Sequence, residues 1–220
     1  MKRFSTAELL DSDAGTPQEI ADSLRDLRGF NHRFGGISTT LEMIEKAARR
    51  IPGDRFSLLE VAAGSGYVAQ TVRERLQANG ITLNVTLLDR AKSHLGNGTA
   101  ALVANALALP FPDSSFDLVS CNLFVHHLSP DECYIFFREA LRVCRKAVLV
   151  NDLIRDFIHL ILVYAARPFY RSRITKHDAP ASVRQAYTQA EMRAMLRHSG
   201  ASQVEIDSHF LFRMGAIAWK

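Results

Sequence analysis

The sequence predicts an α/β protein built on one doubly wound, mostly parallel sheet that ends in an antiparallel hairpin. Three observations carry this prediction. Short apolar runs of strand length alternate with segments of helical periodicity, which is the pattern of βαβ units. The central runs are continuously apolar, as in strands that are buried on both faces. The last two strand candidates are joined by too few residues for a crossover and must run antiparallel.

The helices are marked by their first turns. Three segments place Ser or Thr at the N-cap and Glu three residues later, a capping box that satisfies free backbone N–H groups. They are Thr16-Pro17-Gln18-Glu19, Ser129-Pro130-Asp131-Glu132 and Thr188-Gln189-Ala190-Glu191. The last of these helices is expected to end at Gly200. Further helices are expected after the Gly35-Gly36 turn, from about Tyr67, and over residues 152–170.

The strands are expected between these helices, at residues 57–61, 83–88, 101–103, 116–121 and 147–151. Residues 203–207 and 209–219 form the predicted hairpin at the sheet edge. Parallel strands joined by right-handed crossovers place helices on both faces of such a sheet.

Composition indicates a soluble globular protein of one domain. The 220 residues are 47% hydrophobic and 23% charged, and the net charge is only +4. The basic residues are scattered, so nucleic acid is not an expected partner, and the cluster Arg167, Arg171, Arg173 and Lys176 is interpreted as a solvated face. The N-terminus has no apolar signal segment, and the run FIHLILVYAA is too short to span a bilayer. We therefore expect a cytoplasmic protein.

The three cysteines support the same compartment. Cys121, Cys133 and Cys144 are an odd number, widely spaced and set among apolar residues. This pattern fits neither a disulfide framework nor a metal site, and no metal is expected. We interpret them as buried free thiols.

The segment LLEVAAGSGYVAQ (residues 58–70) predicts a ligand site. It reads as a strand, a loop of small residues and the start of a helix, and Gly64-x-Gly66-x-x-Ala69 fits the dinucleotide fingerprint. Asp89 closes the next strand at the spacing of an acid that binds ribose hydroxyls. The alternative reading is a tight turn and a surface aspartate.

Glu60 discriminates between nucleotide-like ligands. A pyrophosphate at this helix terminus would lie beside the Glu60 carboxylate, which is unfavourable. An ammonium and a sulfonium group would be attracted, and S-adenosylmethionine carries both. Two alternatives stay open: an NAD(P)-dependent oxidoreductase, and a non-catalytic nucleoside-binding module.

The segments LLEVAAGSGYVA, VTLLDR and ALALPFPDSSFDLVSCNLFVHHL resemble successive motifs of the class I S-adenosylmethionine-dependent methyltransferases over about residues 56–151. The resemblance implies a Rossmann-like sheet of seven strands, with S-adenosylhomocysteine as product. It implies that Glu60 and the loop glycines hold the methionine portion, Asp89 the ribose, and Asn105 and Ala106 the adenine. The full predicted donor site is Glu60, Ala62, Gly64, Gly66, Asp89, Arg90, Asn105, Ala106 and Asn122.

Two residues depart from the motifs of that family. Ala62 replaces the usual first glycine of the loop, which makes it the position to inspect for backbone strain, and Asn105 replaces the more usual aspartate. The flanks SLRDLRGFNHRFGG, VNDLIRD and KHDAPASVRQAYTQAEM resemble a bacterial subfamily of small-molecule methyltransferases that is often encoded beside type III polyketide synthases. This resemblance implies methylation of a phenolic or quinone-like polyketide; oxygen is the expected methylated atom, and carbon and nitrogen stay open as alternatives.

Candidate catalytic residues are His126 and His127, which follow the fourth strand, where the acceptor should meet the donor. Either could be a general base for a phenol, or the pair could pack and line the pocket without taking a proton. His177-Asp178 is expected in a solvated loop with Pro180. In the segment FNHRFGG, Asn31, His32 or Arg33 is expected near the donor carboxylate, with Arg33 as the natural counter-charge.

The expected organisation has four parts: an N-terminal helical cap (1–52), a donor-binding core (53–151), an acceptor-side lid (152–187), and the last helix with the hairpin (188–220). The apolar helix in the lid is interpreted as core, as the wall of a pocket for a small hydrophobic acceptor, or as a surface resting on a membrane. Peripheral membrane contact and oligomeric state stay open.

Overall fold

A computed structural model describes residues 1–12, 14–91 and 100–220. Its strands form one sheet in the order β3-β2-β1-β4-β5-β7-β6. They are β1 (Arg55–Val61), β2 (Thr82–Asp89), β3 (Ala100–Val103), β4 (Phe116–Asn122), β5 (Cys144–Leu153), β6 (Gln203–His209) and β7 (Arg213–Trp219). The first five are parallel, and β7 runs antiparallel to both β5 and β6. The predicted fold class is confirmed.

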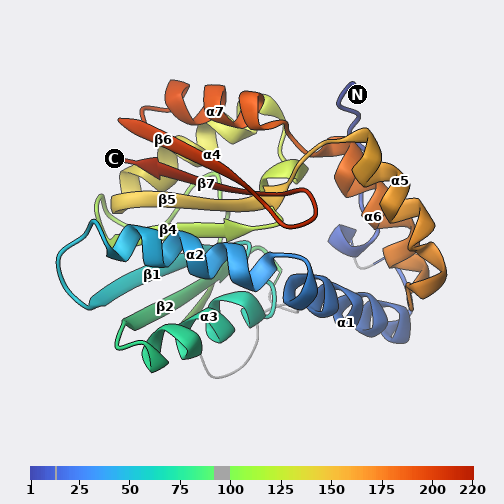
Figure 1. Cartoon of the computed structure of the whole chain (residues 1–220), viewed down its shortest axis with the longest axis horizontal. Coiled ribbons are helices and arrows are strands. Elements are labelled where there is room, and N and C mark those ends of the chain that lie inside the picture. Colours follow the sequence, from blue (N-terminus) through green and yellow to red (C-terminus); the bar gives the residue numbers. More distant parts are fainter. Residues whose placement is uncertain (13, 92–99) are drawn as a thin grey trace.

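Helices cover both faces of the sheet (Figure 1). On one face lie α2 (Gly36–Ala48) and α3 (Tyr67–Ala78), and on the other lie α4 (Pro130–Val143) and α7 (Gln189–His198). Each face has its own buried apolar cluster. The three cysteines are buried and free, as predicted.

A third group of helices lies beyond the carboxyl ends of the parallel strands, on the right of Figure 1. It consists of α1 (Pro17–Arg33), α5 (Phe157–Ala165) and α6 (Arg173–Gln185), which pack α1 on α6 and α5 on α6. Three short 3₁₀ turns, Leu10–Ser12, Val125–His127 and Arg167–Phe169, connect to this group. None of the helices described is both long and apolar enough to cross a membrane.

The capping signals located three helices correctly. The side chains of Thr16, Ser129 and Thr188 each accept a hydrogen bond from the backbone N–H of the glutamate three residues later. The carboxylate of that glutamate in turn accepts a hydrogen bond from the backbone N–H of the cap residue. These bonds satisfy N–H groups that have no partner within the helix.

The helix predicted over residues 152–170 is wrong at both ends. Strand β5 continues to Leu153, because its last residues pair with β7 and Leu153 lies opposite Arg213. Helix α5 begins only at Phe157, where the Asp156 side chain accepts hydrogen bonds from two backbone N–H groups. Pairing with a distant strand therefore extended β5 into a segment that was read as helix.

His177 and Asp178 were predicted in a loop with Pro180, and this is also wrong, because all three lie inside α6. Proline removes one helical hydrogen bond and usually ends a helix. Here Ser172 caps the first turn, and buried side chains on either side of Pro180 anchor the helix. Tertiary packing outweighs the local signal.

Candidate functional site

A cavity of about 640 Å³ lies where the carboxyl ends of β1, β2 and β4 face the third group of helices. Sequence motifs far apart in the chain meet there. The predicted donor-site residues that line it are Glu60, Ala62, Gly64, Asp89, Arg90, Asn105, Ala106 and Asn122. His126 and His127 line it as well.

Gly66 is the one predicted donor-site residue outside this lining. It is the N-cap of α3 and has a φ of +70°. A Cβ atom here would collide with the Leu87 side chain. Gly66 therefore lets α3 approach β2 closely and does not itself face the cavity.

The loop after β1 has a strained backbone at Ala62, the position singled out for inspection. Ala62 has a φ of +53°, in the left-handed region that side chains disfavour. Of the five described non-glycine residues with positive φ, four line the cavity: Ala62, Leu123, Leu211 and Phe212. Strain of this kind concentrates at functional sites.

Glu60 is buried at the base of the cavity, with only 3% of its surface exposed. Its parallel neighbour in the sheet is Ser120, whose hydroxyl donates a hydrogen bond to the carboxylate. Burial raises the pKa of Glu60 to about 7, and the Ser120 bond only partly opposes this. No cation neutralises Glu60 among the described residues, so it is suited to a cationic ligand.

Asp89 and Asn105 lie at the ends of adjacent strands, and each already holds a backbone group. The Asp89 carboxylate accepts hydrogen bonds from the N–H groups of Gly64 (2.8 Å) and Ala91 (2.9 Å). The Asn105 side-chain oxygen accepts from the N–H of Leu107 at 3.0 Å. Each oxygen keeps a lone pair for a ligand hydroxyl or amine.

Arg213, at the start of β7, brings a buried guanidinium to the cavity. It donates to the Phe34 carbonyl at 2.9 Å and, through longer contacts of 3.2 to 3.4 Å, to amide oxygens of Asn31, Asn122 and Asn151. Burial lowers the pKa of Arg213 to about 10, and Asp152 offsets this only in part. Within the described ranges no carboxylate forms an ion pair with Arg213, since Asp152 pairs with His126.

Arg33 does not fill the role predicted for it. It is exposed and absent from the cavity lining, whereas Asn31 is buried and lines the cavity. Two residues along a helix turn the side chain by about 200°, so Asn31 and Arg33 point to opposite sides. The buried guanidinium that lines the cavity is that of Arg213.

The two histidines have different surroundings. His126 is buried between two carboxylates: its Nδ1 lies 2.6 Å from Asp152 Oδ1, and its Nε2 lies 3.6 Å from Glu8 Oε1. Burial alone would lower the pKa of His126, but Asp152 and Glu8 outweigh it and raise the pKa to about 10. His126 is therefore an imidazolium near neutral pH.

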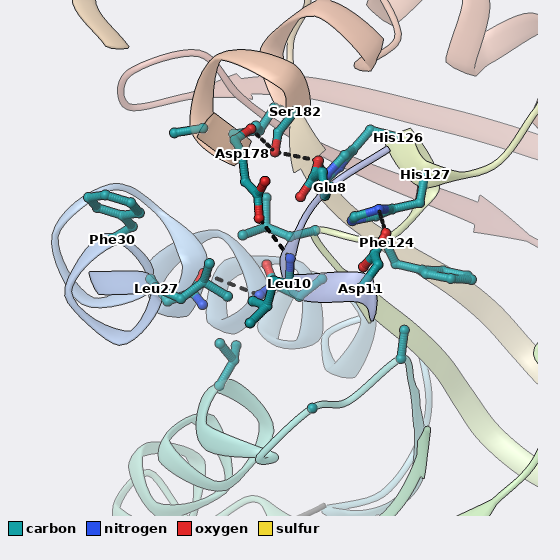
Figure 2. Close-up of a pocket in the computed structure, with 18 of the residues that line it drawn as sticks. Glu8, Leu10, Asp11, Leu27, Phe30, Phe124, His126, His127, Asp178 and Ser182 are labelled. Carbon is teal, nitrogen blue, oxygen red and sulfur yellow. Dashed lines mark hydrogen bonds and ion pairs between the residues drawn. The ribbon is translucent and has the colours of Figure 1, made fainter. Parts of the chain in front are cut away.

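His127 is more exposed, and its Nδ1 lies 2.9 Å from Asp11 Oδ2 (Figure 2). When Nδ1 carries the proton and donates it to Asp11, Nε2 is left as an acceptor. The centroids of the His126 and His127 rings lie 4.2 Å apart. The pair thus combines a fixed cation with an imidazole that can accept a proton.

An N-terminal segment, residues 1–12, brings carboxylates that sequence reasoning missed. Arg3 donates to the carbonyl oxygens of His126, Leu128 and Gln185. Glu8 accepts from Ser182 at 2.7 Å, and Asp178 accepts from the N–H of Leu10 (Figure 2). Asp178 also accepts from the N–H of Leu9. Ligand atoms of Glu8, His126 and His127 lie within 4.8 Å of one another, which is also a spacing at which a cation could bind.

Comparisons with known proteins agree with this geometry. A family described as a methyltransferase domain matches residues 59–150. The 27-O-demethylrifamycin SV methyltransferase of Amycolatopsis mediterranei is 32% identical over 155 residues, which cover 59% of this chain and 56% of that protein. The ubiquinone/menaquinone biosynthesis C-methyltransferase UbiE of Stenotrophomonas maltophilia is 33% identical over 103 residues, which cover 43% and 39%. The chain therefore spans about half the length, or less, of these relatives.

Solved structures share the fold. The plantazolicin methyltransferase BpumL, solved with S-adenosylhomocysteine, superposes with a TM-score of 0.71 at 11% sequence identity. The superposed region covers 96% of this chain and 93% of the BpumL chain. The CMeT domain of the citrinin polyketide synthase superposes with a TM-score of 0.65 at 15% sequence identity, and the superposed region covers 96% of this chain and 59% of that one. The matched residues 59–150 include the loop after β1, Asp89, Asn105 and both histidines of the cavity, so the chain is similar to methyltransferases in the part that forms most of the candidate donor site.

Proposed function

We propose that this protein transfers the methyl group of S-adenosylmethionine to a hydrophobic small molecule, and that the acceptor is a phenolic or quinone-like polyketide methylated on oxygen. One observation carries the donor assignment. Glu60 and Arg213 are buried charges of opposite sign, neither has an ion-pair partner among the described residues, and both line the same cavity. A zwitterionic amino-acid group satisfies both charges.

The remaining donor contacts follow from that placement. Glu60 holds the ammonium group, Arg213 the carboxylate and Asp89 the ribose hydroxyls, while Asn105 and Ala106 border the adenine. Gly64 has open space where a Cβ would stand, so its backbone can approach the ligand. The bound donor supplies a methyl group already activated on a sulfonium, and the protein contributes mainly position and orientation.

The acceptor occupies the apolar part of the cavity, between the N-terminal segment and the helices beyond the sheet. Leu10, Leu27, Phe30 and Phe124 surround that space in Figure 2. Residues 152–187 act as an acceptor-side lid and residues 1–52 as a cap over the core of residues 53–151. Residues 188–220 complete the sheet and, through Arg213, the donor site.

The histidines divide the handling of the acceptor proton. His127, oriented by Asp11, accepts the proton of the hydroxyl through Nε2. His126 stays protonated between Asp152 and Glu8 and stabilises the developing phenolate.

The relatives support the reaction class and leave its finer details to experiment. One is named for a demethylrifamycin and the other for C-methylation in ubiquinone and menaquinone biosynthesis.

Turnover with a panel of alkylresorcinols, hydroxynaphthoquinones and their C-blocked analogues tests the proposal. We expect S-adenosylhomocysteine to form together with a product heavier by one methylene, and an O-methyl fragment in its mass spectrum. His127→Ala should abolish turnover and keep donor binding. Donor binding without turnover on any acceptor would instead identify a non-catalytic module, and a C-methyl product would refute O-methylation.

A further inference from the structure

Helix α5 exposes an apolar face unusual for a helix in water. Phe157 and Ile158 have 64% and 60% of their surfaces exposed, Ile161 has 50%, and Phe169 in the following turn has 84%. Scattered apolar residues are common on protein surfaces, but four large ones on consecutive turns form a patch.

The opposite face of the same helix belongs to the cavity. His159 is buried, and His159, Leu162 and Val163 line the cavity. Helix α5 lies at the outer edge of the molecule and packs on α6 (Figure 1). A single helix therefore separates the cavity from the surroundings of the protein.

The charges around the patch are mostly positive, although Asp156 caps the first turn of α5 beside it. Residues 157–177 contain four Lys or Arg residues and no Asp or Glu. The guanidinium groups of Arg167 and Arg184 lie 5.7 and 5.5 Å from the centre of the Tyr164 ring, at the edge of the patch. Arg171 is exposed, and Arg173 pairs with Glu19 of α1.

We propose that the patch formed by Phe157, Ile158, Ile161 and Phe169, with its basic border, docks on the surface of an anionic lipid bilayer. Apolar side chains that enter the headgroup region beside Lys and Arg are the recognised chemistry of interfacial helices. At nine residues, α5 is far too short to span a bilayer and lies in its surface. A second copy of this chain fits less well, because a symmetric contact would bring the same cations together.

Docking would place the wall of the cavity against the lipid. A hydrophobic acceptor, if the proposed function holds, could then pass between α5 and its neighbours without crossing water. The docking itself does not depend on that function and is measured without turnover.

Co-sedimentation of the whole chain with vesicles tests the proposal. We expect binding to vesicles of phosphatidylglycerol and phosphatidylcholine, much weaker binding to phosphatidylcholine alone, and release in high salt. Phe157→Ser with Ile161→Ser should weaken binding at least about tenfold, and Arg167→Glu with Arg171→Glu should do the same. Ile135→Ser, which removes an equally exposed side chain from α4 on a face of the sheet, is the matched control and should bind normally.

A spectroscopic probe guards against unfolded variants. Trp at position 169 (Phe169→Trp) should shift to the blue with anionic vesicles and be quenched by brominated lipid, whereas Trp at position 135 (Ile135→Trp) should not. The proposal is overturned by a chain that ignores anionic vesicles, or by equal losses in the α5 and Ile135 variants. Gel filtration gives a further test. A native dimer that the double variant Phe157→Ser with Ile161→Ser converts to a monomer would assign the patch to a second copy of the chain and overturn the proposal.

Discussion

Replacing Arg213 with glutamine is expected to weaken binding of S-adenosylhomocysteine by about a hundredfold. The guanidinium is fully buried, and within the described residues its partners are neutral oxygens, several at more than 3 Å. A ligand carboxylate would form two charge-assisted hydrogen bonds with it, each contributing about 1.5 to 3 kcal/mol. Loss of both costs about 3 kcal/mol or more, and each 1.4 kcal/mol is a factor of ten.

The assay compares two ligands by calorimetry. 5′-Methylthioadenosine has the adenosine and sulfur of S-adenosylhomocysteine but no amino-acid group, so its affinity should be the same for Arg213→Gln and the native protein. Arg213→Lys keeps the charge without the planar fork and should fall between them. Thermal unfolding, followed in parallel, identifies a misfolded variant. Equal losses for both ligands, or no loss for either, would refute the assignment of Arg213 to the carboxylate.

Four further predictions concern three other charged groups, Glu60, Asp89 and His126. Burial raises the pKa of Glu60 to about 7 from an ordinary 4.5, so the folded protein keeps a proton that the unfolded chain loses. Its free energy of unfolding should therefore fall by about 3 kcal/mol as pH rises through this window, and Glu60→Gln should remove that slope in urea titrations. Because the ligand ammonium requires the ionised carboxylate, affinity for S-adenosylhomocysteine should rise toward pH 8, and a flat profile would contradict this. Asp89→Ala should weaken the same ligand by about 1 to 3 kcal/mol, and unchanged affinity would remove Asp89 from the site. In profiles of kcat against pH, the native protein should keep a high kcat up to pH 10, near the raised pKa of His126. His126→Gln should lower kcat across that range and leave the affinity for S-adenosylhomocysteine unaltered. An unchanged kcat would exclude a catalytic cation at this position.

Local chemistry explains why much of the fold was predictable. Capping boxes, apolar strands and the small-residue loop are signals contained in a few consecutive residues, and each has the predicted structure. Ala62 was the position to inspect, because the family that the loop resembles usually has glycine there, and its backbone is strained.

The missing parts of the site depend on contacts between distant segments. Glu8 and Arg213 lie near opposite ends of the chain and reach the cavity only through tertiary packing. Nothing beside Glu8 in the sequence distinguishes it from a surface charge. One signal was available for Arg213: it stands within the otherwise apolar hairpin segment HFLFRMGAIAW, where a charge requires a partner.

The limits of β5 and α6 depended on the same kind of contact. Because β5 pairs with β7 up to Leu153, the strand extends into residues that were predicted to be helical. Buried side chains of α6 keep Pro180 within the helix. Propensity is outweighed where long-range contacts are strong.

Calorimetric titration of S-adenosylhomocysteine into the native protein at about pH 8 tests the central claim most directly. The account predicts one binding site per chain, with a dissociation constant in the range of about 1 to 100 µM. No heat at about millimolar ligand, together with a fluorescence change on adding NADH, would contradict it and assign the cavity to a dinucleotide.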